Sequence, residues 1–524
     1  MSAAPARLSS TRERVHPAVR SRRVRELALL GAGAVIPLVC ALVISVEVPN
    51  LSIGLLLGIG VGVLCVISLM VSTRYEFTVM AVALYLGLLD GPVKLGIGGH
   101  ETVSAIRDIL IGAVGLGAVL RLLVRRERLT LPPLSAWVLA FVAVVLSEAF
   151  NPHTHGLTKS LGGFRQLLEW VPFFFFGYAI MRSKPRLRRL FLVLGVIALA
   201  NGAVSAYQSR LSPTQLAAWG PGYRELALGT KGLGGRSFKS EGVARVRPPG
   251  LGGDAGFAGG TAIIALPGIL ALLAIGRRRR RWPIVLLCAG ALVAVATGLG
   301  RLQVVGTLVA AASFAALSIT AGRRALRPLL ALAALVVIAI PVGFALEQTL
   351  GSGTFSRYES IVTGEHSDNK LPSLTLIPKQ LSKAPFGVGL GIAGGAAGFG
   401  GLTTEALEGH AADAETQYNF LADEVGVLGL LLWIGLSIRL LVIVIPGLRR
   451  VRDTELLIAL AALSASFVAI TVIGFYGPTL ASSALGPFFW FFAGTVAYWF
   501  LGPGRQELMV APPRVAPVAV EIAA

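Results

Sequence analysis

An acidic and amide-rich segment, EGHAADAETQYNFLADEVGVLGLLLW at residues 408–433, runs directly into an apolar helix. At about 100° per residue, Glu415, Asn419 and Gly426 fall on one helical face, and the small residues of that face let a neighbouring backbone approach. A partly desolvated carboxylate at the membrane boundary is a stronger base than an exposed one, so Glu415 is our candidate general base, and Asn419, one turn below, is a candidate to orient either Glu415 or the sugar. Glu424 lies on the opposite face and is expected to take no part. The alternative is structural, an acid that complements the helix dipole.

Arginines recur at the outer ends of expected helices, where basic residues are less common than on the cytoplasmic side. TGLGRLQVVG places Arg301 in a tight turn between two spans, GGFRQLLEW begins a span with Arg165, and ARVRPPG carries Arg245 and Arg247 ahead of another. The planar guanidinium binds oxyanions in bidentate fashion, which suits a diphosphate. Each arginine alone is more simply a snorkelling interface residue, but several at one membrane depth favour an anionic substrate.

Histidine and cysteine give weaker signals. His410 competes with Glu415 for the role of base, although a lone loop histidine is more often solvated. His153 and His155, in NPHTHG, have no third ligand nearby in the sequence. The three cysteines all fall inside expected spans and form no CxxC pair: Cys40, Cys65 and Cys288. We therefore predict no metal site and no cofactor.

Hydrophobic residues make up 54% of the 524 residues and charged residues only 14%, so a soluble fold cannot bury the apolar surface. Long apolar runs predict an all-α polytopic membrane protein rather than a β-barrel, which shows short alternating segments. Roughly fourteen transmembrane helices of about 17–24 residues are expected. They begin near Leu27, Leu51, Glu76, Val103, Leu134, Phe164, Leu187, Ala255, Pro283, Leu302, Pro328, Glu424, Leu456 and Thr479.

The formal net charge of +20 is explained by topology rather than by nucleic acid. Basic clusters such as RSKPRLRR at 182–189, RRRRR at 277–281 and RRVRD at 449–453 fall on every second connection. The positive-inside rule places these clusters and both termini in the cytoplasm, in a multi-pass protein of the cytoplasmic (inner) membrane. Contact with anionic lipids accounts for the arginine runs without a nucleic-acid partner.

The chain divides into a basic cytoplasmic leader, a transmembrane domain and a disordered cytoplasmic tail, at residues 1–26, 27–501 and 502–524. Two long outer loops, about 208–254 and 347–423, interrupt the transmembrane domain. The first carries a net charge of +4, and the second, counted through Glu424, a net charge of −6. A basic loop facing an acidic loop suits an anionic substrate and a proton-accepting base, although two solvated loops that attract each other explain the charges more simply.

The segment ETQYNFLADEVGVLGLLLW resembles the signature near the C-terminal end of O-antigen ligases and related bacterial polysaccharide polymerases. Gly426 and Gly429 match the glycines of that signature, and Glu415 stands where ligases carry histidine and polymerase-like relatives often carry an acid. TGLGRLQVVG is similar to the family's arginine turn, with Arg301 at the arginine position. RPPGLGGDAG, and FSRYESI with Arg357 followed by KAPFGVGLGIAGG, resemble two further family segments, so the likeness covers roughly residues 160–435.

The resemblance implies a fold similar to the C-type glycosyltransferases and a metal-independent transfer of a glycan. The donor would be a polyprenyl-diphosphate-linked glycan in the outer leaflet, and the acceptor a hydroxyl of another glycan or of a lipid. Arginine can take the charge of a diphosphate leaving group in place of a metal. The catalytic residues would be Glu415 and Arg301. Substrate would be bound by Arg165, Arg245, Arg247, Arg357 and Asn419.

Two other functions remain open at this point. A polytopic transporter or flippase of lipid-linked saccharides should carry ionisable residues or broken helices near the bilayer midplane, whereas Asp90, Asp108, Glu148 and Glu169 all lie toward outer helix ends. A relative without catalytic activity that scaffolds envelope assembly is the third possibility. The sequence leaves the sugar, the acceptor, the choice between ligase and polymerase and the oligomeric state undetermined.

Overall fold

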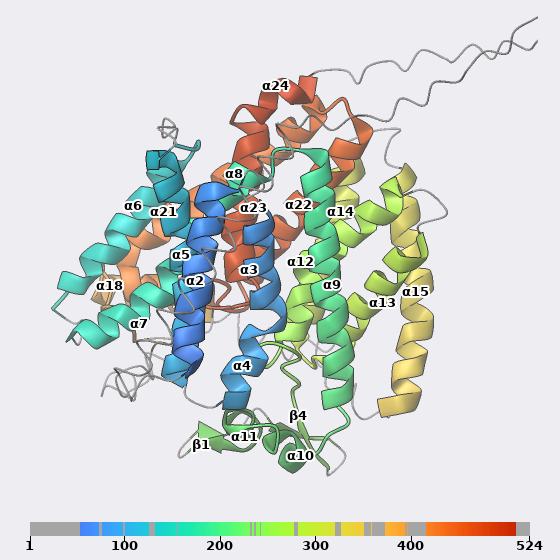
Figure 1. The fold of residues 1–524 in the computed structure, drawn as a ribbon, viewed down its shortest axis with the longest axis horizontal. Coiled ribbons are helices and arrows are strands. Elements are labelled where there is room, and N and C mark those ends of the chain that lie inside the picture. Colours follow the sequence, from blue (N-terminus) through green and yellow to red (C-terminus); the bar gives the residue numbers. More distant parts are fainter. Residues whose placement is uncertain are drawn as a thin grey trace, which may run out of the picture. The chain divides into compact units, whose positions relative to one another are not determined.

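The structure is a computed structural model that is mostly helical (Figure 1). In the part of the chain that it describes, six helices are long and apolar enough to cross a membrane, or seven if one bent pair is a single span. A helical membrane protein is what these helices indicate, but the expected number of fourteen is not reached. The described residues are 53–72, 76–97, 100–124, 131–152, 154, 156–230, 233–234, 237–240, 243–276, 281–319, 326–350, 358, 373–392, 396 and 416–509.

The first half of the chain alternates apolar helices with shorter pieces. Its elements are α2 (Ile53–Val71), α3 (Glu76–Leu88), α4 (Asp90–Ile97), α5 (His100–Val124), α6 (Ser135–Ser147), η1 (Glu148–Phe150), α7 (Gly156–Leu168), α8 (Pro172–Ile180), α9 (Lys184–Gln208), α10 (Pro213–Ala217), α11 (Pro221–Leu228), β1 (Gly229–Thr230), β2 (Leu233–Gly234), β3 (Ser237–Ser240) and β4 (Val243–Val246). The strands form two antiparallel pairs, β1 with β2 and β3 with β4.

The second half contains most of the six helices that are long and apolar enough to cross a membrane. Its elements are α12 (Phe257–Ile275), α13 (Arg281–Thr297), α14 (Arg301–Ile319), α15 (Leu326–Leu350), α18 (Ile377–Lys383), α21 (Gln417–Arg450), α22 (Thr454–Ile473), α23 (Gly486–Phe500) and α24 (Gly504–Met509). Three apolar stretches are shorter than the six candidate spans, namely Gly58–Val71 of α2, Ser135–Phe150 and α13. α23 has 15 residues, and the span expected from Leu27 lies outside the described residues.

The chain forms two compact units, and the smaller one comprises residues 1–79 and 105–129. In this unit α2 packs against α5 through small residues. A side chain at Gly117 would meet Leu69 and the backbone of Val66, and the Arg121 guanidinium donates to the carbonyls of Leu69 at 2.9 Å and Ser72 at 2.7 Å. The arginine thereby caps the C-terminal end of α2, whose last carbonyls have no partner within the helix.

The larger unit, residues 80–104 and 130–524, is built around α12. This helix packs against α9, α13, α14, α15 and α22 (Figure 1), and 89% of the residues in its most apolar 18-residue stretch are buried. A helix surrounded on all sides must be apolar on all sides, as its sequence FAGGTAIIALPGILALLAI is. Gly259 leaves room for the Gln303 side chain of α14, and Gly260 for Ala484 in the segment before α23, so the N-terminal end of α12 can pack closely at the site described below.

Three expected spans differ in the structure. The span expected from Phe164 is two helices, because α7 ends at Leu168 and Pro172 begins α8. α7 is amphipathic rather than uniformly apolar and is not one of the six candidate spans. The helix expected from Glu424 begins seven residues earlier, at Gln417, and the one expected from Thr479 begins later, at Gly486.

The expected outer loop 208–254 contains secondary structure where it is described. α11 packs against α4 (Figure 1), and α4, α10, α11 and β4 share a small core of Leu95, Leu216, Tyr223, Ala227 and Val246. We call residues 209–249 the outer module. Its two ends meet where the Gln208 amide donates to the carbonyl of Gly250 at 3.0 Å and accepts from its N–H at 2.8 Å.

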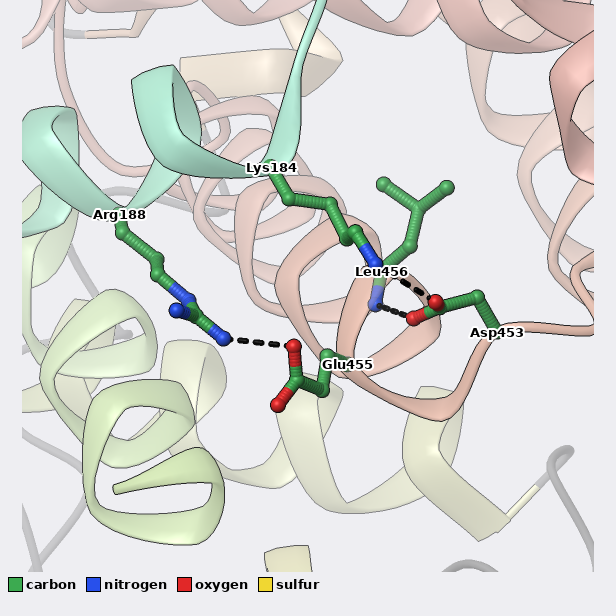
Figure 2. A network of polar contacts seen from close by, with 5 residues as sticks. All are labelled: Lys184, Arg188, Asp453, Glu455 and Leu456. Carbon is green, nitrogen blue, oxygen red and sulfur yellow. Dashed lines mark hydrogen bonds and ion pairs between the residues drawn. The ribbon is translucent and has the colours of Figure 1, made fainter. Parts of the chain in front are cut away.

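The opposite end of the unit, predicted to be cytoplasmic, is joined by two ion pairs between α9 and α22 (Figure 2). Lys184 contacts Asp453 at 2.7 Å and Arg188 contacts Glu455 at 2.6 Å. Asp453 also caps α22, because its carboxylate accepts from the Leu456 N–H at 2.9 Å. Part of the expected disordered tail 502–524 is ordered, since it contains α24; residues 510–524 lie outside the described residues.

Candidate functional site

The N-terminus of α21 is a buried polar hub centred on Asn419. Thr416 caps the helix by accepting from the Asn419 N–H, and its hydroxyl donates to Asn419 Oδ1 at 2.5 Å. The Asn419 amide donates to the Ser373 carbonyl at 2.7 Å and to Gln380 Oε1 at 3.1 Å, and Oδ1 also accepts from the Ser373 hydroxyl at 3.3 Å. The asparagine is fully buried, so its bonds join α21 to the segment that contains α18.

Two acids follow the hub, and both are buried. Asp423 Oδ2 accepts from Gln380 Nε2 at 3.1 Å, and Glu424 Oε1 accepts from the Ile392 N–H at 3.1 Å. Lys159 of α7 is also buried; burial lowers the pKa of its ammonium, and the charge of Glu424 opposes that shift. Every residue from Thr416 to Gly426 is buried, so Glu424 lies in the interior of the protein, and the expectation that it takes no part in the chemistry stays a prediction.

The helical stripe expected through Gly426 is interrupted at that residue. Gly426 adopts φ 60° and ψ −159°, and a side chain there would lie 2.3 Å from the Pro385 carbonyl oxygen. Gly387 has φ 91°, and a side chain there would lie 2.7 Å from the Glu424 carbonyl oxygen. Only glycine combines that conformation with such backbone contact, so residues 385–392 are held against the kink of α21.

A cavity of about 240 Å³ lies beyond the hub, at the predicted outer ends of three helices. Phe257 and Gly260 line it from the first turn of α12, Leu302 and Gln303 from the first turn of α14, and Leu485 from the residue before α23. The remaining polar lining consists of Asp254, Thr479, Ser482 and Ser483. Helix N-termini present unsatisfied backbone N–H groups and a partial positive charge, so three such ends around one cavity favour an anionic ligand.

Gln417 connects the hub to this cavity. Its Oε1 accepts from the Leu480 N–H at 2.8 Å and from the Thr479 hydroxyl at 3.5 Å, and Thr479 lines the cavity. The Gln417 backbone N–H donates to the Gly474 carbonyl at 2.9 Å. The first turn of α21 is therefore fixed to the segment between α22 and α23 that forms one wall of the cavity.

The predicted arginines occupy several elements. Arg301 is the first residue of α14, directly before the two α14 residues that line the cavity, and is half-buried. Arg165 lies on α7, Arg245 in β4 and Arg247 just after it; all three are half-buried and none lines the cavity. The structure thus brings Arg301 next to the cavity, whereas the other three arginines lie on α7 and at β4, which contribute no residue to its lining.

Several predicted residues lie outside the described residues, namely Glu415, Arg357, His410, His153 and His155. The residue after Arg357 is described: the Tyr358 hydroxyl donates to the carbonyls of Val295 at 3.1 Å and Ala296 at 2.9 Å. These carbonyls end α13, directly before the turn that leads to Arg301. In the described part of the chain, no three His, Cys, Asp or Glu side chains are grouped so that they could hold a metal ion.

Sequence reasoning missed the residues that shape the cavity and the hub. Asp254 and Gln303 each lie within a motif quoted above, Asp254 in RPPGLGGDAG and Gln303 in TGLGRLQVVG, two residues after Arg301. Polar residues at helix starts were the available signal for both. Gln380 and Ser373 carried no such signal, because only the tertiary fold brings them to Asn419.

No protein-family model, curated protein or solved structure matches the chain significantly.

Proposed function

We propose that the protein is a membrane glycosyltransferase of the ligase or polymerase type, similar to the O-antigen ligases. It moves a glycan from polyprenyl diphosphate to an acceptor hydroxyl on the outer face of the cytoplasmic membrane. The observation that carries this proposal is the cavity at the N-termini of α12 and α14 and beside the start of α23, with Arg301 next to its lining. Backbone N–H groups and a guanidinium stabilise a diphosphate without a metal.

The proposed reaction is a single displacement at the anomeric carbon of the donor. The acceptor hydroxyl oxygen forms the new bond to that carbon, and the bond from the carbon to the diphosphate oxygen breaks. The leaving diphosphate keeps the electron pair, and Arg301 with the helix N-termini offsets its added charge. Glu415, which precedes the Thr416 cap, receives the hydroxyl proton, and Asn419 fixes the first turn of α21 through its bonds to the α18 segment.

Transport of a lipid-linked saccharide is the second candidate, and one observation favours it. α3 and α4 are bent by 44° at a break, and Asp90 at the start of α4 is buried, as expected of a transporter helix. The kink of α21 does not add to this reading. Residues 427–450 alone extend about 36 Å, which already exceeds a hydrocarbon core of about 30 Å, so Gly426 falls at the boundary rather than at the midplane.

Binding of polyprenyl diphosphate, the common leaving group, tests the proposal without knowledge of the sugar. The purified protein should bind it more tightly than polyprenyl monophosphate. Arg301→Ala should weaken diphosphate binding by about tenfold to a hundredfold, the value of a charge-assisted hydrogen bond. Arg301→Lys should retain only part of the affinity for polyprenyl diphosphate, because lysine keeps the charge but cannot form the two parallel hydrogen bonds of a guanidinium.

Arg449→Ala is the matched control, since Arg449 is an exposed arginine at the far end of α21. It should bind polyprenyl diphosphate as the unsubstituted protein does. Equal binding of monophosphate and diphosphate, or full binding by Arg301→Ala, contradicts the proposed diphosphate site. Transport of a lipid-linked saccharide across vesicle membranes without release of polyprenyl diphosphate would favour the second candidate.

A further inference from the structure

A second cavity, of about 380 Å³, lies at the opposite ends of the central helices, on the face predicted to be cytoplasmic. The last residues of α12 and the first turns of α13 and α15 surround it. Its walls are apolar, formed by side chains such as Leu273, Val285, Leu330 and Ala331. Leu273 and Ala331 are buried, so the interior of this cavity suits hydrocarbon rather than a soluble polar ligand.

Two arginines are the charged residues of this lining, Arg281 at the start of α13 and Arg327 at the start of α15. Both are exposed, and within the described part of the chain neither forms an ion pair with an acid. The cavity lining contains no acid. Guanidinium groups at the rim and an apolar interior together match an amphiphile with an anionic head.

The sequence just before each of these two helices adds further positive charge. The connection before α13 contributes the rest of the run RRRRR at 277–281, and the connection before α15 contains GRRALR at 322–327. Trp282 is 76% exposed directly after Arg281, as expected of an aromatic anchor at the headgroup level of a bilayer. Basic pockets between transmembrane helices on the cytoplasmic side are suited to anionic lipid headgroups.

We propose that this cavity binds an anionic phospholipid of the cytoplasmic leaflet, with its phosphate between Arg281 and Arg327 and an acyl chain against α12 and α15. Soluble anions fit the arginines but not the apolar walls, and zwitterionic lipids carry no net charge to match the two positive charges of Arg281 and Arg327. The site is far along α12 from the proposed diphosphate cavity, since one lies at each end of that helix. It therefore stands whether or not the proposed transfer activity is correct.

The test is native mass spectrometry of the full chain, delipidated in detergent and then titrated with defined lipids. Cardiolipin and phosphatidylglycerol should form adducts at a molar excess at which phosphatidylcholine does not. Arg281→Gln with Arg327→Gln should reduce cardiolipin binding about tenfold or more, since each guanidinium contributes charge-assisted hydrogen bonds. Arg449→Gln with Arg450→Gln removes the same charge from an exposed position on the same predicted face and should bind as the unsubstituted chain.

A second variant tests the apolar wall without changing charge. Ala334 is a half-buried lining residue, and Ala334→Phe should fill the cavity and reduce cardiolipin binding while both arginines remain. Inorganic phosphate at millimolar concentration should not compete. The proposal is overturned by equal cardiolipin binding in the Arg281/Arg327 double variant, by equal binding of phosphatidylcholine, by displacement with inorganic phosphate, or by an Ala334→Phe chain that binds normally.

Discussion

Replacing Asn419 with aspartate tests the hub at the start of α21 with almost no change in side-chain shape. The amide that donates to the Ser373 carbonyl at 2.7 Å and to Gln380 Oε1 at 3.1 Å becomes an oxygen. Both contacts then join two acceptors. A buried carbonyl left unsatisfied costs about 1–3 kcal/mol. Gln380 cannot turn its amide to help without losing the bond to Asp423 Oδ2, so the second contact costs a similar amount.

An acid in the first turn of a helix also gains about 0.3–1 kcal/mol from the dipole, which offsets a small part of the loss. The expected net loss is about 2–4 kcal/mol, confined to the start of α21 and the segment containing α18. Hydrogen exchange measures this locally: amides of residues 417–424 should exchange about 30-fold faster or more. The loss should shrink at low pH, where a protonated aspartate donates to the Ser373 carbonyl again.

Gln506→Glu is the control, because it makes the same amide-to-acid change at an exposed position of α24. It should alter exchange at residues 417–424 by less than about twofold, as expected of a surface substitution. Exchange in Asn419→Asp that equals this control at neutral pH would refute the bonding scheme of the hub. A loss that spreads evenly over all helices would show that the hub holds the whole unit and not only the start of α21.

Two further predictions concern acids. Glu415→Gln should reduce glycan transfer by about a hundredfold or more with donor binding retained. Glu424→Gln should mainly destabilise the protein, because it removes the charge facing buried Lys159. Equal turnover in the two variants, or loss of turnover only in His410→Ala, would contradict the assignment of Glu415 as the base. Burial raises the pKa of Asp453, but the hydrogen bonds from Lys184 and the Leu456 N–H outweigh burial and leave the pKa below its ordinary value of 3.8. The contribution of Asp453 to folding stability is therefore complete above about pH 4 and is lost as the pH falls through the lowered pKa. Thermal unfolding in detergent between pH 3 and pH 6 should therefore show a shallower acid-side fall for Asp453→Asn, which keeps the helix cap, and an unchanged fall would contradict the Lys184 pairing.

The membrane class could be predicted from the sequence because apolar runs are a local property, but helix ends were less predictable. Hydropathy predicts that the apolar span starts near Glu424, while α21 begins seven residues earlier, after the Thr416 cap, in a buried segment. Thr416 is a favourable N-cap residue and so marks a possible helix start, but a cap residue does not indicate where that start lies relative to the membrane. The break at Pro172 likewise depends on α8 packing against α23, where Gly177 meets the Phe491 carbonyl.

The candidate site was predictable only in part, because contacts made by the tertiary fold are not encoded in local sequence patterns. Arg301 and Asn419 could be identified from their chemistry and their place at helix ends. Asp254 and Thr479 line one cavity although more than two hundred residues separate them, and no local pattern encodes that meeting. The stripe expected through Gly426 was wrong beyond Val425, because helical periodicity assumes an unbroken helix, whereas the Gly426 backbone is not helical and the Pro385 carbonyl approaches it.

The Gln208–Gly250 pair has a consequence for how this protein can vary. It brings together two points 42 residues apart in the chain, and Asn201 fixes the next residue by accepting from the Leu251 N–H at 2.9 Å. The ends of the outer module are therefore set by α9, independently of what lies between them. Loop-closure entropy rises only slowly with length, so insertions or deletions in the module away from its contacts with α4 should leave α9 and α12 in their positions.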